Sequence, residues 1–293
     1  MSDFSHQTLL VTGASGHLGR EAVEYLLAHG AKKVIAGTRH PDRITDLAAR
    51  GVEIRRVDFD DAAGMQQAFS GVDRVLLVSS DVLDLEGTRL RQHRNAVAVL
   101  NQSSVSHVVY TSYVGASPNR GLIQNDHFWT EHALGGSHFT WTSMRNHPYA
   151  DFLIGSVANA VASGKRPDAS AGQPRSYVMR SDCARAAAGA LLQASDSRIY
   201  DVTGPRAVAL EEIAKTMAEA TGKPIVRVGM APDELRDVLA SSGMPGFLAD
   251  AFVSFDVDAA EGYHAQATPT VELFTGSKPQ SVLDFLRANI GKA

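Results

Sequence analysis

Three glycines near the start of the chain carry the clearest sign of chemistry. Gly13, Gly16 and Gly19 stand between the apolar run TLLV and the amphipathic segment EAVEYLLAHG. A tight turn, a close approach of backbone to pyrophosphate and close helix–strand packing each favour a residue without a side chain. The free N–H groups and positive dipole of the following helix favour an anion. The pattern predicts a dinucleotide site with contacts from Gly13, Ser15, Gly16, His17, Leu18 and Gly19.

The end of the second apolar run, in VIAGTRHPDR, indicates which dinucleotide this loop binds. An acid here would accept hydrogen bonds from the adenosine ribose, but the chain has Thr38 and Arg39 instead. The planar donor fork of Arg39 suits a 2′-phosphate, and Arg43 stands close enough in sequence to assist. We therefore expect NADPH rather than NADH, with a solvated surface arginine as the alternative interpretation.

Polar residues also follow the third and fourth apolar runs. Asp58 and Phe59 follow VEIRRV, where an acid commonly meets the adenine amino group, and one of the next two aspartates is suited to cap a helix. Ser79 and Ser80 end the run LLVSS, where they either hydrogen-bond the cofactor or only end a strand. We expect all four named residues at the cofactor.

The helix after the fifth apolar run lacks the acid found in typical short-chain dehydrogenases. Those enzymes place a Tyr-x-x-x-Lys pair there, so that the lysine lowers the pKa of a tyrosine that protonates an alkoxide. Neither Tyr110 nor Tyr113 has a lysine four residues on, although Thr111 and Ser112 stand where such enzymes carry a serine beside the cofactor. Reduction of an ordinary ketone by that machinery is therefore not expected.

His127 occupies roughly the place of the missing pair, in DHFWTEHAL. A histidine can donate a proton near neutral pH, so we expect it to position the cofactor or deliver a proton. The alternative is a structural hydrogen bond to Glu131, one helical turn away.

A second group of candidates lies in RNHPYADF, after the sixth apolar run. Asn146, His147 and Pro148 are expected to contact the nicotinamide or its ribose, and Arg145 to anchor the loop. Tyr149 could stack on a flat acceptor or donate its hydroxyl, or it could only pack against the rest of the chain.

Apolar runs alternate with helical segments over the first half, and the runs are apolar throughout. This order predicts a doubly wound parallel α/β sheet covered on both faces. We expect a Rossmann-type NADP-binding domain over residues 1–150. Residues 151–293 should form a smaller, mostly helical substrate-binding cap that is interleaved with the sheet. Arg175, in GQPRSYV, would reach the cofactor phosphates or close over the site, unless it is simply solvated.

Composition excludes several classes of function. The chain is 44% hydrophobic and 20% charged with a net charge of -4, so it has no basic footprint for nucleic acid or an anionic membrane. No apolar run is long enough to span a bilayer, and the N-terminus lacks an export signal. The single Cys183 fits a buried helix position in a cytoplasmic protein. No metal-ligand spacing occurs, so no metal is expected.

Across nearly its whole length the chain resembles the NmrA-like branch of the short-chain dehydrogenase/reductase superfamily, nearest the bacterial NADPH:quinone oxidoreductases and triphenylmethane reductases. The resemblance rests on TGASGHLG, VIAGTRHPDR, LLVSS, QHRN, VVYTS, DHFWTE, MRNHPYADF and IYDVTGPRAVALEEIAKTMAEATGKPI. It implies an NADPH-binding oxidoreductase and makes a homodimer possible. His147 and Pro148 occupy a variable pair before Tyr149, which makes acceptor specificity the least transferable property.

The missing acid suits an acceptor that does not need one. A quinone takes a hydride to give a stabilised phenolate, so the enzyme mainly has to hold nicotinamide and acceptor together in a dry, flat pocket. We expect direct hydride transfer from NADPH to a quinone or dye-like acceptor without flavin. A non-enzymatic dinucleotide sensor that binds a regulatory partner is the alternative. An epimerase or isoflavone-reductase-like enzyme is less consistent, because such reductases carry a lysine at the position of His127.

Overall fold

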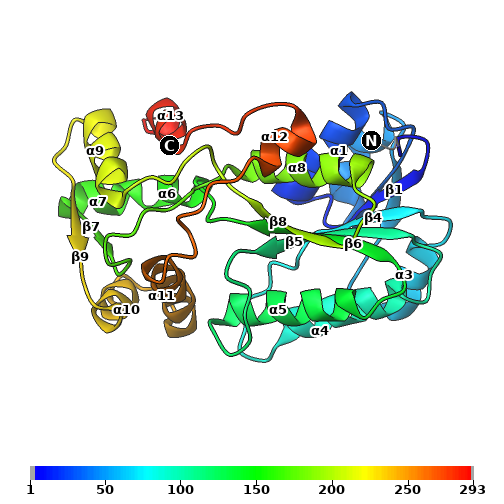
Figure 1. Cartoon of the computed structure of the whole chain (residues 1–293), viewed down its shortest axis with the longest axis horizontal. Coiled ribbons are helices and arrows are strands. Elements are labelled where there is room, and N and C mark those ends of the chain that lie inside the picture. The colour runs from blue at the N-terminus through cyan, green and yellow to red at the C-terminus, as the bar shows by residue number, and fades with distance from the viewer. Residues whose placement is uncertain (1–3, 292–293) are drawn as a thin grey trace.

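A seven-stranded parallel sheet forms the centre of the molecule (Figure 1). The computed structural model describes residues 4–291. The strand order is β3-β2-β1-β4-β5-β6-β8. The strands are β1 (Thr8–Val11), β2 (Lys33–Thr38), β3 (Glu53–Arg56), β4 (Arg74–Leu77), β5 (His107–Tyr113), β6 (Thr140–Asn146) and β8 (Arg198–Val202).

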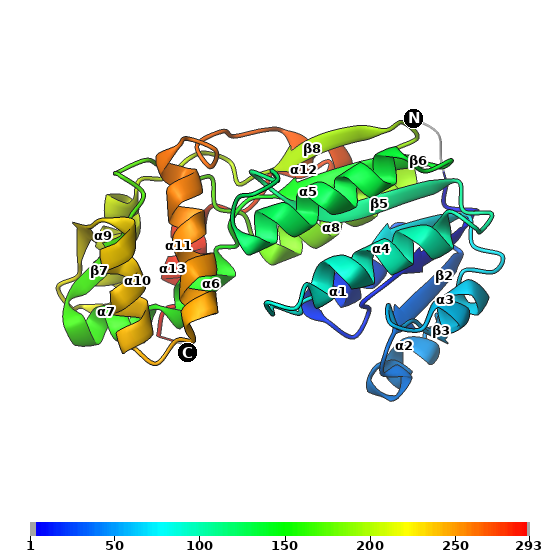
Figure 2. The ribbon, with the colours of Figure 1, turned by 90° about the horizontal axis from the view of Figure 1, so that it is seen from below.

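Helices cover both faces of this sheet, which explains why the central strands β1 and β4 are buried along nearly their whole length. Figure 2 shows the second face, which is covered by α3 (Ala62–Ala68), α4 (Thr88–Leu100) and α5 (Leu122–Gly135). The first face carries α1 (His17–Ala28), α8 (Arg180–Gln193) and α12 (Thr270–Thr275). A short 3₁₀ turn, Pro41–Ile44, leads into α2 (Thr45–Ala48). The Rossmann-type doubly wound fold predicted from the sequence is confirmed.

The strand order changes direction between β1 and β4, which are hydrogen-bonded neighbours. In open α/β sheets, ligands bind outside the carboxyl ends of the strands at this switch point. The glycine loop follows β1 and Ser79 follows β4, so the fold brings two predicted cofactor segments to one place.

The rest of the C-terminal half lies beyond the carboxyl ends of the strands (Figures 1 and 2). It contains a two-stranded parallel sheet of β7 (Lys165–Asp168) and β9 (Val226–Gly229). Around this sheet are α6 (Asp151–Gly155), α7 (Val157–Ser163), α9 (Leu210–Thr221), α10 (Pro232–Ser241), α11 (Gly246–Ala260) and α13 (Val282–Asn289). We refer to these elements together as the cap. The predicted boundary at residue 150 stays a prediction, although β8 and α8 of the second half clearly belong to the main sheet.

The main sheet region and the cap have separate apolar cores. One lies between the sheet and α1 and α8, a second lies on the α3–α4 face, and a third joins α6, α9 and α13 in the cap. Cys183 is fully buried in the first core, as predicted, and burial raises the pKa of its thiol well above the ordinary value. Asp61 caps α3 by accepting a hydrogen bond from the Gly64 amide, as expected for an aspartate there.

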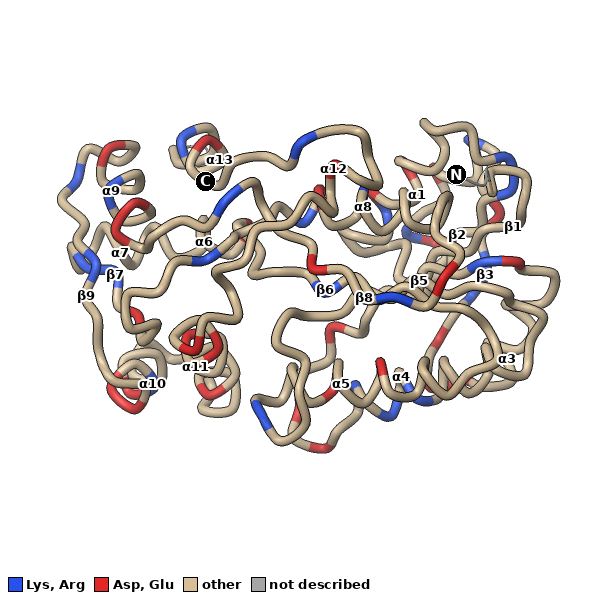
Figure 3. The backbone as a smooth tube through the Cα atoms, viewed as in Figure 1, with Lys and Arg blue, Asp and Glu red and all other residues tan. Residues whose placement is uncertain are grey.

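Charged residues of both signs are interspersed over the molecule (Figure 3). Within residues 4–291 no helix is long and apolar enough to cross a membrane. The same residues contain no cluster of three or more His, Cys, Asp or Glu side chains that could hold a metal ion.

Candidate active site

One cavity of about 1000 Å³ lies between the carboxyl ends of the strands and the cap. It starts at the glycine loop and passes the ends of β2, β4, β5 and β6 before reaching α10 and α11. Of the residues predicted from the sequence, those that line it are Gly13, Ser15, Gly16, His17, Leu18, Gly19, Arg39, Phe59, Ser79, Ser80, Thr111, Ser112, His127, Asn146, His147, Pro148, Tyr149 and Arg175.

Two positions of the glycine loop disfavour a side chain, Gly13 because of its backbone conformation and Gly19 because of lack of space. Gly13 adopts φ +63°, which is strained for other residues. A Cβ on Gly19 would lie 2.4 Å from the carbonyl oxygen of Gly13, so α1 could not approach the loop so closely. The first turn of α1 therefore presents its unpaired N–H groups to the cavity at the end of β1. This geometry fits a bound pyrophosphate.

Two arginines line the cavity just beyond the end of β2, next to the hydroxyl of Ser15 in the glycine loop. Ser15 and Thr38 hydroxyls lie 2.8 Å apart, and Thr38 Oγ1 also accepts a hydrogen bond from the His40 amide at 3.1 Å. Arg39 lines the cavity with its side chain half exposed, and its guanidinium is 3.8 Å from the highly exposed carboxylate of Asp81. Arg43 lines the same region. Arg39 is thus a weakly held cation that a phosphate could engage.

Asp58 does not line the cavity. Its carboxylate accepts hydrogen bonds from the Arg56 guanidinium at 2.9 Å and from the Asp60 amide at 3.2 Å. Phe59 does line the cavity, so an aromatic ring stands where the sequence suggested an acid for the adenine. The contact of Asp58 with the cofactor remains a prediction that this geometry does not support.

The polar residues at the ends of β4 and β5 already form hydrogen bonds within the protein. The Ser79 amide donates to Thr111 Oγ1 at 2.8 Å, which ties the ends of β4 and β5 together. Ser80 donates its hydroxyl to Gln92 at 2.6 Å and its amide to His93 at 2.8 Å. These hydrogen bonds therefore fix Ser79, Ser80 and Thr111 in the cavity wall.

His127 has partners on both ring nitrogens. An Arg89 N–H donates to Nε2 at 2.8 Å, so the ring proton is on Nδ1, which faces the Tyr110 hydroxyl at 2.7 Å. Burial, followed by the Arg89 charge, lowers the pKa of His127 well below its ordinary value. The ring is thus neutral and fixed, an arrangement that favours positioning over proton delivery.

The structural alternative for His127 named the wrong partner: its ring nitrogens face Arg89 and Tyr110, and Glu131 does not pair with it. The Glu131 carboxylate instead accepts hydrogen bonds from Ser112 at 2.7 Å and Ser143 at 2.6 Å, and it forms a two-pronged pair with Arg145. These bonds join α5 to the ends of β5 and β6. Arg145 therefore anchors a helix to the sheet.

The segment after β6 contributes side chains with unused hydrogen-bonding capacity. Asn146 donates to the Tyr149 hydroxyl at 2.9 Å, while its Oδ1 has no partner among the described residues. Both ring nitrogens of the buried His147 also lack a partner there, and burial lowers its pKa to about 4. Neutral His147 can therefore offer one donor and one acceptor to a ligand.

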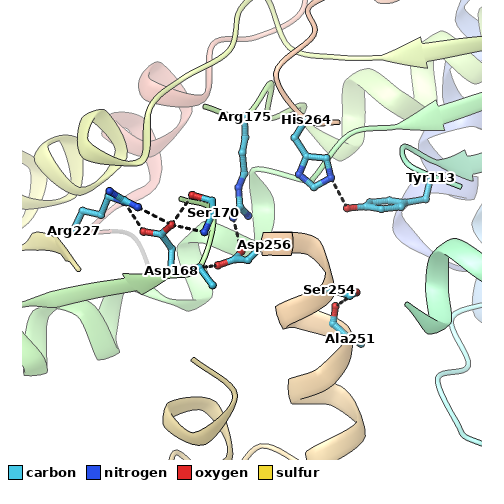
Figure 4. Close-up of polar contacts among 10 residues, drawn as sticks. Tyr113, Asp168, Ser170, Arg175, Arg227, Ala251, Ser254, Asp256 and His264 are labelled. Carbon is cyan, nitrogen blue, oxygen red and sulfur yellow. Dashed lines mark hydrogen bonds and ion pairs between the residues drawn. The ribbon is translucent and has the colours of Figure 1, made fainter. Parts of the chain in front are cut away.

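Arg175 is buried rather than solvated, which corrects the simpler interpretation of its sequence. Its guanidinium pairs with Asp256 of α11 (Figure 4). Its backbone pairs with Val208. Asp256 also accepts a hydrogen bond from the Ala169 amide at 2.7 Å. Arg175 thus fastens α11 to the segment between β7 and α8 and forms part of the cavity wall.

Several residues of the cavity were missed by sequence reasoning. They are Arg89, Gln92, Tyr113, Tyr177, Phe252, Phe255 and Asp256. Tyr113 directly follows Ser112 at the carboxyl end of β5, so its position alone could have indicated it. The aromatic residues of α11 carry no such signal, because only the folding of the cap brings them to the sheet.

The site agrees with comparisons against known proteins. Residues 13–194 match the family described as NAD(P)H-binding. The chain belongs to the NAD(P)H-binding family. It is 30% identical to quinone oxidoreductase 2 of Escherichia coli strain K12, over 87% of this chain and 88% of that protein.

Two solved structures extend the similarity of this NAD(P)H-binding chain. An NADPH-dependent quinone oxidoreductase of Escherichia coli, in complex with NADPH, gives a TM-score of 0.89 at 28% identity, covering 96% of this chain and 99% of that one. A triphenylmethane reductase of Citrobacter sp. gives 0.85 at 26% identity, covering 97% and 99%. The resemblance predicted from the sequence is confirmed, and together the comparisons support an NAD(P)H-dependent oxidoreductase. The acceptor differs between these relatives.

Proposed function

We propose that this member of the NAD(P)H-binding family uses NADPH to reduce a quinone or a similar flat, electron-poor acceptor directly, without flavin. The observation that carries the proposal is the cavity that runs from the glycine loop to the aromatic residues of α11. Its volume of about 1000 Å³ gives room for a dinucleotide and a flat acceptor in contact. The similarity to a quinone oxidoreductase that binds NADPH supports the same conclusion.

The residues of the chain then divide the work along the cavity. The turn at Gly13 and the start of α1 bind the pyrophosphate, and Arg39, assisted by Arg43, binds the 2′-phosphate. His147 and Asn146 have unused polar atoms for the nicotinamide end.

When bound, the reduced nicotinamide supplies a hydride. Neutral His127, held by Arg89 and Tyr110, helps to position the cofactor. Tyr149 and the aromatic residues of α11 exclude water around the acceptor. No strong acid is required, because a hydroquinone anion is a stabilised phenolate that water can protonate.

The preference for NADPH is tested by Arg39→Ala. We expect the KM for NADPH to rise about 10- to 100-fold, as expected for loss of a charge-assisted hydrogen bond, while the KM for NADH changes little. NADPH oxidation is followed by absorbance with 1,4-benzoquinone as the acceptor. Arg50→Ala is the matched control, because Arg50 is also about half exposed but lies outside the cavity.

Two results would contradict the proposal. An equal rise in KM for NADPH and NADH in the Arg39 variant would contradict the proposed contact between Arg39 and the 2′-phosphate. Tight NADPH binding without turnover of quinones or dyes would contradict the reductase activity and favour the alternative function, a dinucleotide sensor.

A further inference from the structure

Tyr113 and His264 form a pair between the sheet and the cap that no predicted role explains. Tyr113 lines the cavity at the end of β5, and its hydroxyl lies 3.1 Å from Nε2 of His264 (Figure 4). His264 follows α11, does not line the cavity and is fully buried behind the tyrosine. The pair therefore joins residues that are 151 positions apart in the sequence.

The surroundings of His264 hold it in place and keep it neutral. Its carbonyl oxygen accepts a hydrogen bond from the Ser176 amide at 2.8 Å, which fixes its backbone. Burial, followed by the charge of Arg175 and the ring of His147, lowers its pKa to about 2. A neutral imidazole carries one N–H and one lone pair.

The second ring nitrogen indicates which atom carries that proton. Nδ1 of His264 is buried and finds no partner among the described residues. A proton on Nδ1 would leave an unpaired buried donor, which is rarer and costlier than an unpaired lone pair. The favoured tautomer thus has its proton on Nε2, where it donates to the oxygen of Tyr113. The phenolic proton of Tyr113 is then free to point into the cavity.

We propose that Tyr113 donates its O–H to the acceptor oxygen on which negative charge gathers during reduction, and that His264 is the positioning residue that directs this O–H. The inference rests on the proposed function and narrows the substrate class to acceptors with a carbonyl-type oxygen. Tyr113 acts as a hydrogen-bond donor and keeps its proton, because burial raises its pKa well above the ordinary value. Donors aimed at developing charge in a dry site are among the strongest contributors to catalysis.

The reaction balances without a proton from the protein. A quinone gains a hydride, which is two electrons and one proton, and becomes a hydroquinone anion. That anion takes its second proton from water. Tyr113 stabilises the anionic oxygen throughout and ends the cycle unchanged.

The first test measures Tyr113→Phe with three quinones of increasing hydroquinone-anion basicity: 2,5-dichloro-, unsubstituted and 2,5-dimethyl-1,4-benzoquinone. We expect kcat/KM to fall about 10- to 100-fold for the dimethyl compound and least for the dichloro compound, because a more basic oxygen depends more on the donor. Damage to the fold would lower all three equally. Tyr263→Phe is the matched control, since Tyr263 is exposed, adjacent to His264 and outside the cavity.

A second test examines the positioning role of His264. His264→Gln keeps an N–H donor near the position of Nε2, whereas His264→Leu removes it. We expect the glutamine variant to retain most of the activity and the leucine variant to show the same ordering among quinones as Tyr113→Phe. Adding His264→Leu to Tyr113→Phe should cause little further loss, because the two residues act as one unit.

A binding readout separates this inference from turnover. The oxidised-cofactor complex is titrated with 4-nitrophenolate, an anion that resembles the oxygen of the product. Loss of the donor in Tyr113→Phe should weaken binding about tenfold and move the nitrophenolate absorption band to longer wavelength, since its oxygen loses a hydrogen bond.

The outcomes distinguish the two proposals. A wild-type protein that binds NADPH but reduces no quinone overturns the proposed function, and the nitrophenolate titration then tests only whether Tyr113 donates its O–H to an anionic oxygen in the cavity. Quinone turnover together with an unchanged or uniform effect of Tyr113→Phe overturns the role of Tyr113 and leaves the proposed function standing. An unshifted nitrophenolate band in the phenylalanine variant also overturns it.

Discussion

Individual side chains in and beside the cavity differ most in whether the protein already uses their hydrogen-bonding atoms. His127 and Glu131 are both fully engaged, the first by Arg89 and Tyr110 and the second by residues of β5 and β6. His147 is buried in the same cavity with both nitrogens unused. Since buried polar atoms without partners are costly, unused atoms that face a cavity are the better candidates for ligand contacts.

Replacing His127 tests its role as a neutral positioning residue. His127→Leu should lower the free energy of unfolding by about 1–3 kcal/mol, because Arg89 loses the acceptor of its buried N–H. His127→Gln keeps an acceptor and should lose less, as measured by urea denaturation of both variants.

The pH profile of kcat in the wild-type protein tests whether His127 delivers a proton. Because burial beside Arg89 lowers its pKa well below the ordinary value, this residue should produce no inflection between pH 6 and 7. An inflection there that disappears in His127→Gln would restore proton delivery as its function.

At the scale of elements, the close contact between β1, its turn and α1 creates the phosphate site. Only the missing side chain of Gly19 allows the first turn of α1 to rest against Gly13. The bonds of Glu131 do comparable work for α5, because they fix that helix against two strand ends. Site precision in this molecule therefore comes from rigid contacts between helices and strand ends.

Gly19→Ala should disturb both packing and cofactor binding. The added methyl group would meet backbone, which cannot move aside, so we expect a loss of about 1–3 kcal/mol in stability and weaker NADPH binding. Thermal unfolding and a fluorescence titration with NADPH measure the two effects.

Gly135→Ala is the matched control for Gly19, because this glycine ends α5 and a Cβ there would meet no other atom. Alanine should be neutral or slightly stabilising there. Equal NADPH affinity in the Gly19 variant and the wild-type protein would contradict the role given to this contact.

At the scale of the whole molecule, burial keeps several histidines neutral in both halves. Burial lowers the pKa of His93 and His107 to about 3 and that of His264 to about 2. In the unfolded chain these groups titrate near pH 6.5, so the unfolded state takes up protons first as the pH falls. Their contribution to stability is present above pH 6.5 and is lost progressively towards pH 3. Buried aspartates with raised pKa values, such as Asp126 and Asp258, act in the opposite direction.

A single variant isolates this effect from the aspartates. His107→Gln should reduce the stability lost between pH 7.5 and pH 5 by about 2 kcal/mol, because one histidine no longer protonates on unfolding. His107 bonds Thr140 and Thr142 at the start of the sheet and does not line the cavity, so the cofactor site is untouched. Urea denaturation at both pH values provides the measurement, with exposed His6→Gln as the control. An unchanged pH difference would show that His107 is protonated in the folded state.

The sequence by itself determined the parallel sheet, the succession of strands and helices along the chain, and the glycine loop. These features follow from local patterns, namely apolar runs, helical periodicity and glycines at a strand–helix junction. Asn146, His147 and Tyr149, which the sequence proposed for the site, do line the cavity, because residues at the carboxyl ends of parallel strands meet at one edge. His127 lines the same cavity from the middle of α5. Local patterns did not predict β7, β9 or α12, which are short and mostly depend on partners elsewhere in the chain.

Only the tertiary structure decided the partners of these residues. Helical spacing suggested that His127 would bind Glu131, but the packing of α5 against the sheet gave each of them other partners. The sequence around Arg175 suggested a solvated surface residue, but in the structure this arginine is buried and pairs with Asp256 of α11. The pairing of Tyr113 with His264 likewise depends on a segment 151 residues away. Sequence patterns report local geometry and burial, whereas the protonation and direction of a buried polar group depend on which distant atoms the fold places against it.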